Sequence, residues 1–112
     1  MMEFSRLYAS FHVAGFKFYD GYTVLNDIKV GDSIELVPSP DNPYDPDAVV
    51  LYYKSAMLGY IPRRENALIA NLFRFGHTDV FEANVQAVRN DCEPCDQLRI
   101  GIYFRDANSY KL

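Results

Sequence analysis

The sequence predicts a mainly β domain, a small barrel of about six antiparallel strands with one helix. Short segments rich in β-branched and aromatic residues recur along the chain, and residues typical of turns separate most of them. Only one segment has the spacing of an amphipathic helix. The 112 residues fit a single domain spanning residues 1–112. The pattern sets no order for the strands within the sheet.

The first part of the chain is predicted to hold two strands joined by an irregular connection. Leu7–Phe16 is rich in β-branched and aromatic residues and ends beside a glycine, as strands often do. Residues 18–21 indicate a bend, and residues 22–28 are expected to be irregular. Val30–Asp32 is predicted to form a turn before Ser33–Val37, where polar and apolar residues alternate as in a strand.

The middle of the chain is predicted to hold a loop and a hairpin. Pro38–Asp47 is crowded with proline and aspartate, and we call it the Pro/Asp loop. Ala48–Tyr53 follows as a nearly continuous apolar strand. Lys54–Ala56 is expected to be a tight turn, which makes Met57–Ile61 the partner strand.

The one predicted helix covers about Arg63–Phe75. Pro62 suits the start of a helix and Gly76 suits its end. Apolar residues recur at helical spacing at Ala67, Leu68, Leu72 and Phe75.

Two more strands are predicted after the helix. Val80–Val88 alternates in character, and Leu98–Phe104 is strongly apolar. The loop Arg89–Gln97 would join them as a hairpin. With these strands the pattern favours an open-mouthed barrel of the OB type.

Composition and charge narrow the class of protein. The chain has nine Tyr, eight Phe and no Trp, more rings than a small core can hold, so we expect some at the surface. A net charge of −4 argues against non-specific binding of long polyanions but allows a small basic site. No apolar run approaches the roughly 18 residues of a membrane span, and charged residues interrupt the N-terminal segment. We therefore expect a soluble, cytoplasmic protein without a membrane partner.

The Pro/Asp loop places an aromatic ring beside a carboxylate. Asn42 can accept backbone N–H bonds in a turn, while Pro43 and Pro46 stiffen the chain on either side. Tyr44 and Asp45 are therefore expected to lie on a conformationally rigid loop. From the residues alone, a rigid connector whose tyrosine packs on a neighbour is favoured over a binding loop, because loops of this composition are common.

The motifs resemble the HIRAN domain family. The run DNPYDPDAVVLY, followed after a hairpin by LGYIPRRENALIA, is similar to the N-P-Y-D-x-x-A-V core and the G-[YH]-[LIV]-P segment of that family. Upstream, VAGFKFYDG resembles its first strand. The resemblance covers about residues 7–88, with the final hairpin extending to residue 105. It implies an OB-like barrel that binds single-stranded DNA at a free 3′ end.

The resemblance gives the Pro/Asp loop a chemical role. The ring of Tyr44 would sandwich a terminal base against Phe18 or Tyr19, and each stack is worth about 1–3 kcal/mol. Asp45 would repel a 3′-phosphate by about 4 kcal/mol at ~4 Å and an effective dielectric near 20. A 3′-hydroxyl would instead donate a hydrogen bond to the carboxylate, worth about 1.5–3 kcal/mol. The pair would thus recognise a strand end.

Cationic and polar residues complete the candidate site. Arg63 and Arg64 follow Pro62 at a helix start, which suits a phosphate, although two solvated arginines paired with a surface acid fit equally well. Lys17 and Tyr60 lie at positions where the family has basic or polar residues, and both would reach phosphates near the end. The candidate residues for nucleic-acid binding are Lys17, Phe18, Tyr19, Asn42, Tyr44, Asp45, Tyr60, Arg63 and Arg64.

No metal, cofactor or catalytic centre is predicted. Cys92 and Cys95 form a lone CxxC without the second half of a four-ligand zinc site, so they are only a weak candidate pair and are expected to be ordinary thiols. Nucleotide-binding and hydrolase motifs are absent from the sequence. The acids at 20, 41, 45 and 47 would suit Mg²⁺-dependent nuclease chemistry, but acids among prolines more often serve turns.

Three functions follow from these observations. The leading hypothesis is a stand-alone, non-catalytic module for single-stranded DNA 3′ ends, acting in DNA repair with any motor supplied by another chain. The second is a protein-interaction or assembly domain that has lost DNA binding, which the acidic charge favours. The third is a metal-dependent nuclease.

Overall fold

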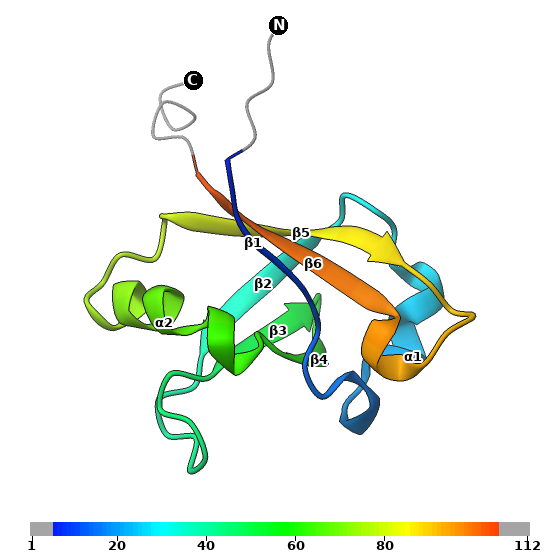
Figure 1. The fold of residues 1–112 in the computed structure, drawn as a ribbon, viewed down its shortest axis with the longest axis horizontal. Coiled ribbons are helices and arrows are strands. Elements are labelled where there is room, and N and C mark those ends of the chain that lie inside the picture. Colours follow the sequence, from blue (N-terminus) through cyan, green and yellow to red (C-terminus); the bar gives the residue numbers. More distant parts are fainter. Residues whose placement is uncertain (1–5, 106–112) are drawn as a thin grey trace, which may run out of the picture.

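The computed structural model describes residues 6–105. Their six strands form one antiparallel sheet, which curls into a half-barrel (Figure 1). The order of the strands in the sheet is β1-β6-β5-β2-β3-β4. Their bounds are β1 Leu7–His12, β2 Ser33–Pro38, β3 Val49–Tyr53, β4 Ala56–Tyr60, β5 Phe81–Val88 and β6 Leu98–Phe104. The predicted fold class, a mainly β OB-like barrel, is confirmed.

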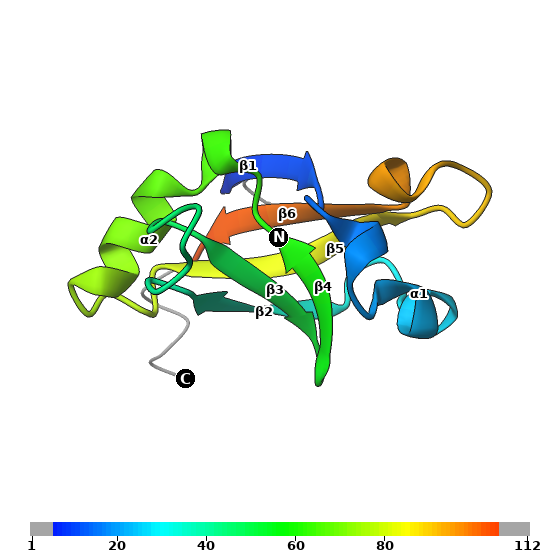
Figure 2. The same cartoon turned by 90° about the horizontal axis from the view of Figure 1, so that it is seen from below.

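The two edges of the sheet meet where the chain continues beyond β1. Ala14 and Tyr60 form an isolated antiparallel bridge, with two backbone hydrogen bonds of 2.9 Å. Opposite this seam β2 pairs with β5 only at Ser33 and Ile34, after which the two strands part. The barrel is therefore closed by one bridge at the seam, while β2 and β5 are not paired with each other beyond Ile34 (Figure 2).

The core fills the inside of the curl. Inward-facing residues of every strand are buried, and α2 adds Ile69 and Ala70. The largest fully buried side chains include Phe11, Leu51, Leu58, Ile100 and Ile102. Two helices, α1 (Gly21–Val24) and α2 (Ala67–Arg74), lie at opposite ends of the sheet (Figures 1 and 2). In residues 6–105, none of the helices has the length and apolar character that crossing a bilayer requires.

Two predictions for the first part of the chain are wrong. The strand predicted over Leu7–Phe16 ends at His12, because Gly15 adopts a left-handed conformation (φ 75°) and turns the chain into a 3₁₀ turn at Phe16–Phe18. The connection expected to be irregular is helical, with α1 followed by a second 3₁₀ turn at Leu25–Asp27.

The predicted helix is divided. Arg63–Glu65 forms a separate 3₁₀ turn, and α2 begins only after Asn66, whose side chain bonds to the Pro/Asp loop instead of capping the helix. The predicted end is confirmed, since Gly76 has φ 89° and its N–H donates to the carbonyl of Phe73 at 3.0 Å.

Candidate nucleic-acid interface

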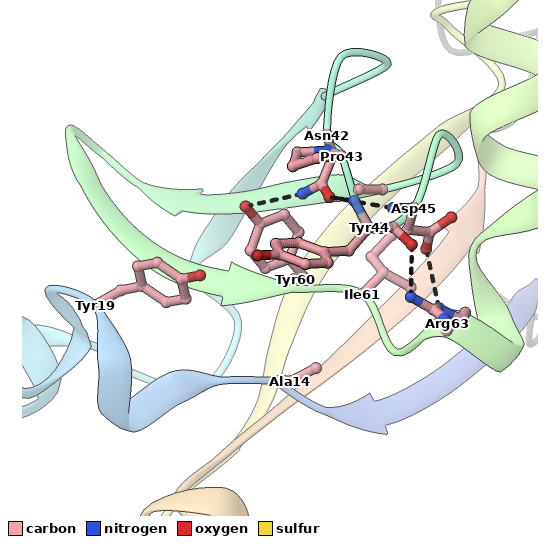
Figure 3. A pocket seen from close by; sticks show the side chains of 10 residues that line it. Ala14, Tyr19, Asn42, Pro43, Tyr44, Asp45, Tyr60, Ile61 and Arg63 are labelled. Carbon is pink, nitrogen blue, oxygen red and sulfur yellow. Dashed lines mark hydrogen bonds and ion pairs between the residues drawn. The ribbon is translucent and has the colours of Figure 1, made fainter.

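An open cavity of about 480 Å³ lies between the Pro/Asp loop, the end of β4 and the chain that follows β1. Its floor includes the seam where Ala14 pairs with Tyr60. Six of the nine predicted site residues line it, from four separate segments of the chain (Figure 3): Tyr19, Asn42, Tyr44, Asp45, Tyr60 and Arg63.

Asn42 builds the loop that carries the exposed ring. Its Oδ1 accepts hydrogen bonds from the backbone N–H groups of Tyr44, at 2.8 Å, and Asp45, at 3.1 Å. This is the turn predicted from the sequence. The side-chain nitrogen of Asn42 also donates to the hydroxyl of Tyr60 at 3.5 Å, which ties the loop to β4. The loop is thus held against the cavity at its tip.

Three tyrosine rings face this cavity. Tyr44 is 84 % exposed and projects from the loop, so most of its ring surface is free for a ligand. Tyr19 and Tyr60 meet edge to face, with ring centroids 5.8 Å apart. Burial, and after it the neighbouring Tyr60, raises the pKa of Tyr19, so this phenol is neutral at physiological pH.

Tyr19, rather than Phe18, is the upstream ring at the cavity. Phe18 is exposed and lines a separate recess of about 180 Å³ with Lys17, beside the loop that carries Cys95. The Nζ atom of Lys17 lies 5.1 Å from the centre of the Phe18 ring. The structure therefore does not bring Lys17 and Phe18 together with Tyr44, because the 3₁₀ turn at residues 16–18 sends neighbouring side chains in different directions.

Asp45 is an anion with several partners. Its side chain is 18 % exposed, Oδ1 accepts from the backbone N–H of Asp47 at 2.9 Å, and Oδ2 accepts from the Asn66 side chain at 2.8 Å. Burial acts to raise the pKa of Asp45, but these two hydrogen bonds and the charge of Arg63 outweigh it and leave the pKa below its ordinary value of 3.8. A carboxylate has roughly four acceptor positions, so room for another donor remains.

The two arginines differ in their surroundings. Arg63 donates to the backbone carbonyl of Tyr44 at 2.9 Å, and its Nε lies 3.6 Å from Asp45 Oδ2. Its side chain is nevertheless 71 % exposed, so the guanidinium is accessible at the rim of the cavity. Arg64 does not line the cavity and pairs instead with Glu65 at 3.8 Å. Arg64 therefore fits the interpretation as a solvated arginine paired with a surface acid better than that as a phosphate-binding residue.

Sequence reasoning missed two residues that hold the loop from α2. Asn66 is buried and contacts Asp45, while Arg74 donates to the carbonyl of Pro46 and pairs with Asp47, both at 3.2 Å. The signal for Asn66 was present, since an Asn directly before an apolar helical run is typical of a helix start. Its actual partner lies 21 positions away, which no local pattern reveals.

The two cysteines lie in the β5–β6 loop, Cys92 before the 3₁₀ turn at Pro94–Asp96 and Cys95 within it, and both are free thiols. Burial is the main cause that raises the pKa of Cys92, so this thiol is protonated at neutral pH. Within residues 6–105, no three His, Cys, Asp or Glu side chains are grouped so that they could hold a metal ion.

The lowered pKa of Asp45 predicts a specific acid sensitivity. The carboxylate stabilises the folded state above its unfolded pKa, and this contribution is lost as the pH falls through the lower, folded pKa. Asp45→Asn lacks the anionic acceptor at every pH. The difference in unfolding free energy between wild type and Asp45→Asn should therefore stay constant above about pH 5 and shrink below about pH 4 in urea titrations. Asp41→Asn, in the same loop, controls for the loss of a charge; a constant difference for Asp45→Asn would contradict the prediction.

Comparisons with known proteins place the fold in a family. Residues 7–105 match the HIRAN domain. A crystal structure of a protein from Lactobacillus plantarum has a TM-score of 0.65 and 21% identity, covering 87% of this chain and 94% of that one. The crystal structure of the HIRAN domain of human HLTF has a TM-score of 0.60 and 16% identity, covering 92% of this chain and 80% of that one. No curated protein matches the chain.

At these identities the two solved structures show the fold, while the family match rests on the sequence itself. That match extends from the first residue of β1 past the end of β6, and so includes the final hairpin as well as the motifs around the cavity. No catalytic family is indicated. The chain belongs to the HIRAN domain family, which is known as a DNA-binding module.

Proposed function

We propose that the protein is a non-catalytic module that binds the 3′ end of single-stranded DNA in the cavity beside the Pro/Asp loop. The observation that carries this proposal is the joint presence, in one open cavity, of three tyrosine rings, an anionic carboxylate and an accessible guanidinium. Membership of a DNA-binding family supports the choice of ligand. Residues 1–112 would act as one such domain.

Base stacking would supply most of the affinity. The cavity volume of about 480 Å³ lies within the range of roughly 300–1,000 Å³ that small-ligand sites occupy. A terminal base would stack on Tyr44, with Tyr60 and Tyr19 forming the opposite wall. Each base–aromatic stack is worth about 1–3 kcal/mol and depends little on which base is present. We therefore expect binding without sequence preference.

Asp45 would provide the preference for a free end. A 3′-hydroxyl donates to the remaining acceptor position of the carboxylate, whereas a 3′-phosphate brings a second anion close to it. Arg63, 3.6 Å from Asp45, partly offsets this repulsion. We therefore expect the preference for a 3′-hydroxyl to be on the order of 10-fold, about 1.4 kcal/mol, rather than the full unscreened repulsion.

The remaining candidates would act further along the strand. The exposed guanidinium of Arg63 suits the phosphate that precedes the terminal nucleotide. Lys17 and Phe18 border the neighbouring recess, so we expect them to contact DNA only beyond that nucleotide. Arg64 is expected to contribute little, because it does not line the cavity and pairs with Glu65.

The test is a fluorescence titration with three oligonucleotides of the same sequence. One carries a 3′-hydroxyl, one a 3′-phosphate, and one exposes only its 5′ end. The 3′-hydroxyl strand should bind most tightly, with a shallow salt dependence because few phosphates are contacted. Equal affinity for all three would refute end recognition. Absence of binding even at low salt would instead favour the protein-interaction alternative.

A further inference from the structure

Asn66 is the one polar side chain that is buried outright in the described part of the chain, at 2 % exposure. It lies at the junction between the 3₁₀ turn at residues 63–65 and α2. Its backbone carbonyl accepts from the N–H of Ala70 at 2.9 Å, as the first hydrogen bond of α2. The backbone of Asn66 is therefore part of the helix, and its side chain is free to serve another purpose.

That purpose is a contact with the Pro/Asp loop. An Asn at a helix start usually accepts a hydrogen bond from a backbone N–H of the first turn, but the Asn66 side chain makes no such cap. Its amide instead donates to Asp45 Oδ2 at 2.8 Å. Since a buried amide without a partner would be costly, this bond fixes both groups.

We infer that Asn66 is a positioning residue for strand-end recognition, which holds the Asp45 carboxylate so that it faces the terminal sugar. This inference rests on the proposed function. Asn66 holds Oδ2 from the buried side, while the only other side-chain partner of that oxygen within residues 6–105 is Arg63, which is more distant and largely exposed. Without Asn66 the carboxylate would turn toward the guanidinium. The two charges would then neutralise each other more completely.

The expected signature separates positioning from a merely structural role. Stacking on Tyr44 does not involve Asn66, so affinity for a 3′-phosphate strand should change less than about 3-fold when Asn66 is altered. Affinity for the 3′-hydroxyl strand should fall until the preference of about 10-fold has nearly disappeared. A general loss of structure would lower both affinities together.

The test measures both affinities, with matched thermal melts, in Asn66→Leu and Asn66→Ala. Leucine keeps most of the buried volume and removes the amide donor together with its carbonyl oxygen. Asn26→Ala is the control, because Asn26 is an exposed asparagine in the 3₁₀ turn at residues 25–27 and does not line the cavity. It should keep the wild-type preference.

Each result decides one question. A wild-type protein that does not discriminate overturns the proposed function and this inference with it. Wild-type discrimination that persists in both Asn66 variants overturns the role of Asn66 alone, as does an equal loss of both affinities. If neither variant folds, NMR of the wild type decides. The side-chain amide signals of Asn66 should shift as Asp45 titrates and on addition of the 3′-hydroxyl strand, and unmoved signals would overturn the inference.

Discussion

Replacing Gly59 by alanine is expected to lower the free energy of unfolding by about 2–4 kcal/mol. Gly59 lies in β4 with φ 147°, a conformation that other residues rarely adopt. A Cβ atom built there would lie 2.4 Å from the carbonyl oxygen of Ala14 and 2.6 Å from Cγ1 of Val13. Neither contact is tolerable, and the Ala14 oxygen is main chain, so the seam that closes the barrel must open.

Thermal unfolding should report this loss as a fall in Tm of about 8–32 °C, given a shift of roughly 4–8 °C per kcal/mol for a domain of this size. Gly31→Ala is the matched control. Gly31 also has a positive φ, of 94°, but a Cβ there meets no atom within 4 Å. The difference between the two variants isolates the clash at the seam; equal shifts in Tm would contradict it. DNA affinity should fall with Gly59→Ala, because Tyr60 follows directly and lines the cavity.

The elements that the sequence predicted well are those whose signals are local. Leu98–Phe104 is observed with its predicted bounds, because an apolar run and flanking turn residues mark both of its ends. Ser33–Val37 is extended by a single residue, to Pro38. The order of the strands was not predictable, since strands that are far apart in the sequence pair with each other, as β1 does with β6. Such pairing depends on the packing of distant segments rather than on neighbouring residues.

In the candidate site, too, local features were predictable from the sequence and contacts between distant segments were not. The turn at Asn42 follows from its own side chain and the prolines beside it, and the structure confirms that turn. Which of two adjacent rings faces the cavity depended on a 3₁₀ turn that begins after Gly15, whereas the sequence pattern indicated a strand as far as Phe16 and a bend only from Phe18. Asn66 was missed for a different reason: a bond to Asp45 replaces the helix cap that its position suggests.

Tyr44→Ala is expected to weaken binding of a 3′-hydroxyl strand by roughly 5- to 150-fold, the equivalent of about 1–3 kcal/mol for one lost stack. Stability should hardly change, because the ring is 84 % exposed and contributes little to the core. Tyr22→Ala is a closely matched control, since Tyr22 is also a surface tyrosine, 74 % exposed, but does not line the cavity. Equal affinities in the two variants would show that Tyr44 is not a stacking platform.

Tyr44→Phe separates the ring from its hydroxyl. Phenylalanine keeps the stacking face, so this variant should bind within about 2-fold of wild type if stacking is the source of affinity. Neither change at Tyr44 should alter the ratio of 3′-hydroxyl to 3′-phosphate affinity, because the ring contacts the base in both strands. In the proposed function, that ratio would depend on Asp45 and Asn66, through the carboxylate. Affinity should therefore respond to substitution of Tyr44, and end preference to substitution of Asp45 or Asn66, although Tyr44 and Asp45 are neighbours in the Pro/Asp loop and Asn66 contacts Asp45.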